Sequence, residues 1–168
     1  MQNVLESVGT VLSASAEDKI YGDLSYDVTD AGEVVITGYN GDAATVEIPS
    51  EIDGKPVTSI GWSAFQNCTS LTTITIPGSV KSVGWSAFKD CTGLTGITIS
   101  NGVTIIEGSA FEGCTSLTAI AIPDSVMDIK YNAFKYCTGL KEISISNGVT
   151  ILDMSIFEGC TSLTAIAI

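Results

Sequence analysis

Residues 113–120 read GCTSLTAI, and residues 159–166 read GCTSLTAI again. Each copy is centred on a cysteine, and three further cysteines keep the same spacing along the chain. The five cysteines, each 23 residues after the last, are Cys68, Cys91, Cys114, Cys137 and Cys160. Similarity at a fixed period is the signature of repeat architectures, in which short units stack on their neighbours. The sequence therefore predicts a stack of equivalent coils.

Apolar residues recur with the same 23-residue step in all five units, without an insertion. The end of each unit, such as LTAIAI at residues 117–122, alternates like a short β-strand. Before it, Ala110, Phe111, Cys114 and Leu117 have the spacing of a short helical turn. The phenylalanine column consists of Phe65, Phe88, Phe111, Phe134 and Phe157.

A longer period overlies the first one. Residues 99–122 and 145–168 match at all but four positions, and the loop after each strand alternates between a Pro-containing and an Asn-Gly form. The larger unit is therefore 46 residues, or two coils. We infer that a pair of coils was duplicated recently.

A 23-residue unit is too small to bury its apolar edge alone, but stacking turns each column into a buried ladder. The pattern A-F-x-x-C-T-x-L-x-x-I-x-I-P-x-S-V-x-x-I over residues 57–168 resembles the BspA-like leucine-rich repeats of bacterial cell-surface proteins. The resemblance implies a leucine-rich-repeat solenoid, either α/β or a β-rich right-handed coil, with short parallel strands. It also implies secretion or cell-surface display and the binding of a protein or carbohydrate partner.

Three segments are expected. Residues 1–19 are either a leader remnant or a short N-terminal amphipathic segment, and residues 20–56 are a β-rich cap. The cap contains a hairpin formed by two strand-like stretches, 24–29 and 34–37, which closes the first coil. Residues 57–168 hold five repeats. Because the last residues are strand-like, we expect either a longer parent protein or end-to-end association through this strand.

Charge and hydropathy exclude several classes of partner. The formal net charge is −12, from 7 basic and 19 acidic residues, whereas nucleic-acid binding needs a basic face. Anionic membrane surfaces are disfavoured for the same reason. No stretch approaches the ~18–20 apolar residues of a membrane-spanning helix. Residues 1–60 hold eleven of the acids against only Lys19 and Lys55, so the negative charge is concentrated at the N-terminal end.

The sequence offers little for catalysis or for a cofactor. It contains no histidine, the commonest general base and metal ligand, and no two cysteines have the close spacing of a zinc site. Equivalent cysteines on neighbouring coils point in parallel, which does not suit a disulfide. We interpret them as small buried hydrophobic residues. No enzyme activity, metal or cofactor is predicted.

Candidate partner-binding residues are those that the ladders do not require. Strand residues between ladder positions are expected on the concave face, where most are small and Glu142 is charged. A second column holds large residues two positions before the alanine column: Trp62, Trp85, Tyr131 and Met154, with Gly108 among them. Exposed aromatic rings stack on sugars or anchor proteins, although they can also simply cover the coil. The candidates are Trp62, Trp85, Tyr131 and Glu142; the alternative is a structural spacer that displays another domain, and an enzyme is less well supported.

Overall fold

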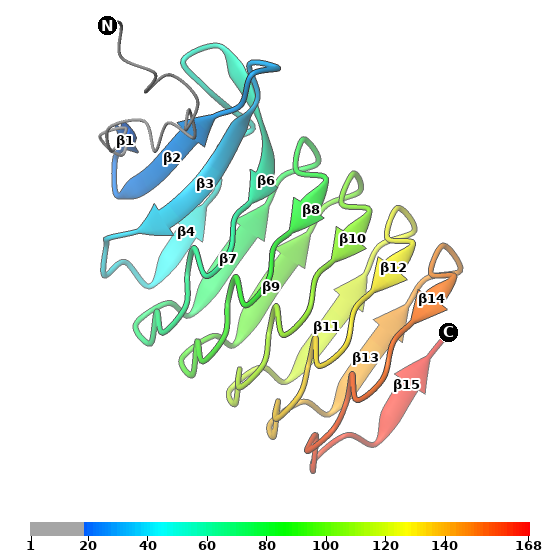
Figure 1. The fold of residues 1–168 in the computed structure, drawn as a ribbon. Helices are drawn as coiled ribbons and strands as arrows, with labels where there is room; N and C mark the ends of the chain where they lie inside the picture. The colour runs from blue at the N-terminus through cyan, green and yellow to red at the C-terminus, as the bar shows by residue number, and fades with distance from the viewer. Residues whose placement is uncertain (1–18) are drawn as a thin grey trace, which may run out of the picture.

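The computed structural model describes residues 19–168, which form a solenoid whose coils each contribute one short strand to each of two sides (Figure 1). The segment predicted as a leader remnant lies, apart from Lys19, outside the described residues. The 23-residue coils and their parallel strands confirm the predicted solenoid.

The fold begins with three antiparallel strands, and the second and third of them form the predicted hairpin. β1 (Lys19–Tyr21) pairs with β2 (Leu24–Val28), and β2 pairs with β3 (Val34–Tyr39). β3 then pairs in parallel with β6 (Lys55–Ile60), so the hairpin continues directly into the first side of the solenoid. β5 (Glu51–Ile52) pairs with β6 beside this path. The remaining strands of the first side are β8 (Ser82–Val83), β10 (Ile105–Ile106), β12 (Asp128–Ile129) and β14 (Ile151–Leu152).

The second side carries the longer strands and is divided into two parallel sheets between β9 and β11. β4 lies in the segment predicted as cap, yet it pairs in parallel with β7 as the later strands pair with one another. The first sheet contains β4 (Thr45–Glu47), β7 (Thr73–Ile76) and β9 (Gly96–Ile99). The second contains β11 (Ala119–Ile122), β13 (Glu142–Ile145) and β15 (Ala165–Ala167).

Residues 19–168 contain no helix, so the α/β form of the prediction is wrong. An α-helix needs successive amides to bond four residues back along the chain. Here the amides alternate: the Ala110 N–H donates to Glu107 O in its own coil, and the Phe111 N–H donates to Ala133 O in the next coil. Ser109 and Gly113 have φ of 55° and 74°, which is left-handed backbone. The helical spacing therefore belongs to tandem turns that bond sideways to the neighbouring coil.

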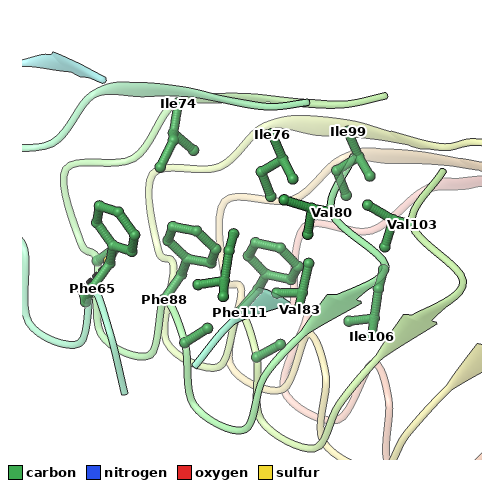
Figure 2. Close-up of a cluster of buried hydrophobic side chains, with 14 of the residues drawn as sticks. Phe65, Ile74, Ile76, Val80, Val83, Phe88, Ile99, Val103, Ile106 and Phe111 are labelled. Carbon is green, nitrogen blue, oxygen red and sulfur yellow. Dashed lines mark hydrogen bonds between the residues drawn. The ribbon is translucent and has the colours of Figure 1, made fainter. Parts of the chain in front are cut away.

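The phenylalanine column is a continuous ring stack inside the solenoid (Figure 2). Phe111 is fully buried and lies 5.3 Å, centroid to centroid, from both Phe88 and Phe134. Tyr39 extends the stack at the hairpin end, 5.3 Å from Phe65. The cap and the repeats therefore share one core.

The cysteines also join neighbouring coils. All five are free thiols, and three of them, Cys91, Cys114 and Cys137, are fully buried, as the interpretation of a small hydrophobic residue requires. Each of these also donates its S–H to the phenylalanine carbonyl of the preceding coil, as Cys114 Sγ does to Phe88 O at 3.2 Å. A thiol is a weak donor, but it gives the buried phenylalanine carbonyl one additional hydrogen bond.

These surroundings predict unequal thiol reactivity. Burial raises the pKa of Cys114 to about 12, so its reactive thiolate is scarce at pH 8. Cys68 is only half-buried, and its interaction with the neighbouring Cys91 thiol lowers the pKa of Cys68 below its usual value. In the native protein at pH 8, iodoacetamide should modify Cys68 first and leave Cys114 unmodified until the chain unfolds. Peptide mass spectrometry over time measures both, and rapid native modification of Cys114 would contradict the burial.

Candidate partner-binding surfaces

The aromatic column lies in the turns that follow strands of the first side. Trp62 follows β6, Trp85 follows β8 and Tyr131 follows β12, and their exposed fractions are 78%, 40% and 39%. Met154, after β14, is also exposed. The structure thus places three of the four predicted site residues on one outer column, and their role in binding stays a prediction.

Gly108 is the residue that brings two of these rings together. It is buried, and a Cβ built on it would lie 3.1 Å from two carbons of the Trp85 ring. The Trp85 ring lies across this coil and meets Tyr131 edge-on, with centroids 4.9 Å apart and planes at 73°. Edge-to-face contact is a favourable arrangement for aromatic rings. We therefore call Trp85 and Tyr131, with Gly108 beneath them, the aromatic platform.

The sequence pattern at Gly108 shows only that the core needs no aromatic ring in this column. The structure shows that the glycine makes room for the ring of the previous coil. The same relation recurs elsewhere: the Asp90 side chain covers Gly113, and the Tyr136 ring covers Gly159. In the sequence, a glycine that follows a large residue at a spacing of 23 is the signal that could have predicted these contacts.

Glu142 does not belong with the aromatic column. It starts β13 on the second side, whereas the column follows strands of the first side (Figure 1). Its exposed side chain lines a shallow hollow of about 280 Å³ over β11, β13 and β15, together with small residues such as Ala119, Ser144 and Ala165. Half-buried Ile97 also lines it, where the second side is divided. The hollow offers one carboxylate and a flat, small-residue floor.

Three of the five lysines in the repeats pair with nearby acids. The Lys130 ammonium, next to Tyr131, lies 2.6 Å from the Asp128 carboxylate, and the hydrogen bond that it donates to this carboxylate raises the pKa of Lys130. The other two pairs are Lys89 with Glu112 at 3.1 Å and Lys135 with Glu158 at 3.0 Å.

Within residues 19–168, no group of three His, Cys, Asp or Glu side chains comes together in a way that could hold a metal ion. The same part of the chain has no helix long and apolar enough to cross a membrane. The last coil has apolar residues on its open edge, with Ile151, Leu152 and Ile166 all exposed. End-to-end association through this edge stays a prediction.

Stacked coils of 23 residues with parallel strands and internal apolar ladders define a leucine-rich-repeat solenoid. Residues 40–168 match the family described as BspA type leucine rich repeat region, in six copies, and the chain belongs to this family. The match begins 17 residues before the first of the five predicted units, and it includes β4.

Solved structures of three bacterial proteins are similar to this one. A leucine-rich repeat protein of T. pallidum is 32% identical with a TM-score of 0.85, over 89% of this chain and 71% of that one. A leucine-rich cell surface protein of Faecalibacterium prausnitzii is 32% identical with a TM-score of 0.80, and the match covers 88% of this chain and 38% of the F. prausnitzii chain. A leucine-rich repeat protein of Bacteroides ovatus is 33% identical with a TM-score of 0.81, and the match covers 90% of this chain and 41% of the B. ovatus chain. No curated protein sequence matches the chain.

Proposed function

We propose that this chain is a binding or adhesion module of a bacterial surface protein, and that it engages a protein or carbohydrate partner through the aromatic column. The observation that carries the proposal is the aromatic platform, in which Trp85 and Tyr131 are held in fixed contact yet remain exposed. Nothing in the core requires these rings, since Gly108 occupies the same column.

The physical properties of the platform favour binding. Tryptophan and tyrosine provide a large contact area with few rotatable bonds, and they are enriched among the residues that dominate binding energies. The edge-on contact and the glycine beneath it hold Trp85 in place before a partner arrives, which lowers the entropic cost of binding. Trp62 extends the apolar area of the same column.

The location and the absence of catalysis are part of the same proposal. A surface location is supported by the F. prausnitzii relative, which is described as a cell surface protein. A binding role rather than a catalytic one is supported by membership of a repeat family and by a chain without histidine. Glu142 and its hollow are a second, weaker candidate contact, since small residues provide few anchors.

Replacing Trp62, Trp85 and Tyr131 together with serine should abolish or strongly weaken partner binding. Residues that dominate an interface each contribute about 2 kcal/mol or more, so a loss well above tenfold is expected. Binding is first detected on a glycan array and a panel of purified extracellular proteins. The chain has only two tryptophans, and both lie in this column, so their fluorescence should change when the partner binds.

The matched control is Met127→Ser, because Met127 is also an exposed apolar residue but lies outside the column. It should bind as the unmodified chain does. Circular dichroism and thermal unfolding establish that both variants fold. If the folded triple variant keeps full affinity, the column only covers the coil and the proposal is wrong.

A further inference from the structure

A second surface lies at the N-terminal end, where the hairpin meets β4. It is an open cleft of about 400 Å³. Its apolar floor includes Leu24 and Val46, both buried. Its polar lining includes Thr45, two tyrosines and two carboxylates, the last four being Tyr21, Tyr39, Asp23 and Glu47. We call this surface the N-terminal cleft.

The cleft is built on the rigid end of the core. The Tyr39 ring stacks on Phe65 with centroids 5.3 Å apart, and the Tyr39 hydroxyl accepts a hydrogen bond from the Ala43 N–H at 3.1 Å. A Cβ built on Gly41 would lie 2.5 Å from the Tyr39 hydroxyl oxygen and 2.7 Å from Asp23 Oδ2. Gly41 therefore leaves room for a phenol oxygen and a carboxylate oxygen to lie side by side.

The charges around the cleft are one-sided. Residues 19–60 hold eight acidic residues against Lys19 and Lys55, and neither lysine lines the cleft. Residues 1–18 contain no lysine or arginine. In the described part of the chain, the ion pairs join lysines and acids of the repeats, and none includes Asp23 or Glu47. Within residues 19–168, the two exposed carboxylates therefore have no lysine partner.

We propose that the N-terminal cleft binds the cationic side chain of a lysine or arginine on a partner peptide. The carboxylates of Asp23 and Glu47 receive the charge, and the tyrosine rings attract it through their π faces. The aliphatic stem of the same side chain lies along the apolar floor. The negative field of the cap speeds the approach of such a basic segment. This site is separate from the aromatic column, and it adds a basic protein segment to the partners of the chain.

The test measures the binding of fluorescein-labelled tetralysine to the full chain by fluorescence anisotropy. At about 20 mM salt we expect saturable binding, and at about 150 mM salt a clearly weaker affinity, because exposed charges are screened. The variant with Asp23→Asn and Glu47→Gln should bind about tenfold more weakly. Tyr21→Ser should weaken binding by a smaller factor without changing the charge.

The control carries the same change in charge outside the cleft, through Asp30→Asn and Glu51→Gln, both exposed and neither in the lining. It should keep the affinity within about twofold. An equal loss in this control would show a general attraction to the acidic cap, and absence of tetralysine binding at low salt would overturn the site outright. Preferential binding of an uncharged N-acetylglucosamine oligomer would likewise overturn the cationic ligand. The variant that lacks Trp62, Trp85 and Tyr131 should still bind tetralysine, which separates this site from the proposed function.

Discussion

Replacement of Phe111 with alanine is expected to lower the free energy of unfolding by about 3–5 kcal/mol, the range for truncation of a buried aromatic residue. Phe111 is fully buried, with ring centroids 5.3 Å from a phenylalanine in each neighbouring coil. Alanine would leave a cavity at the middle of this stack, and two coils would lose packing at once. Urea denaturation followed by circular dichroism measures the change.

Phe157→Ala provides the comparison within the same column. Phe157 is only half-buried and stacks on one side, 6.0 Å from Phe134. Its truncation should therefore cost clearly less than that of Phe111. Equal losses at the two positions, or a transition unchanged by the Phe111 substitution, would show that the ring stack does not hold the coils together.

Replacement of Gly102 with alanine should have an effect of similar size, about 3 kcal/mol or more. Gly102 has φ of 135°, a conformation that side chains rarely adopt, and a Cβ there would collide with the carbonyl oxygen of Gly78 in the preceding coil. Since the backbone fixes the position of the Cβ and the carbonyl is itself a backbone group, rotation of a side chain cannot relieve the collision. Thermal or urea unfolding of the variant gives the loss.

Two other glycines separate the causes of that loss. Gly32 has φ of 79° but open space around it. Gly32→Ala should therefore lower the free energy of unfolding by only about 1–2 kcal/mol, which is the cost of left-handed backbone for a residue with a side chain. A Cβ built on Gly96 would make an ordinary contact, 3.5 Å from Thr73 Cγ2, so Gly96→Ala should change stability little. A Gly102→Ala variant no less stable than Gly32→Ala would mean that the close approach between coils does not constrain the loop.

Much of this fold could be predicted because the apolar columns recur at one spacing. Residues such as Phe111 and Leu117 had to share an interior if their unit was to bury its edge, and both are fully buried. The helical turn could not be decided in the same way. The spacing of Ala110, Phe111 and Cys114 fits a helix and also fits tandem turns, and the choice depends on hydrogen bonds to the next coil.

The candidate surfaces were predictable only in part. Trp62 and Trp85 stood out because the core pattern does not need them. The contact of Trp85 with Tyr131 was missed because it joins residues 46 positions apart across a third coil. The N-terminal cleft was missed because residues such as Asp23 and Glu47 lie on different parts of the cap and follow no period.

The alternation of glycine with larger groups has a consequence for how this array changes length over generations. Gly102 and Gly148 each lie under a backbone carbonyl of the preceding coil, and the alternate coils carry Ser79 and Ser125 at the same position. Removing the coil of Gly102 would put the two serine coils next to each other, and a serine Cβ in the position that Gly102 holds would collide with that carbonyl. Unequal recombination between residues 99–122 and 145–168, which are almost identical, adds or removes two coils and keeps the alternation. Length variants of this gene should therefore differ by multiples of 46 codons rather than 23.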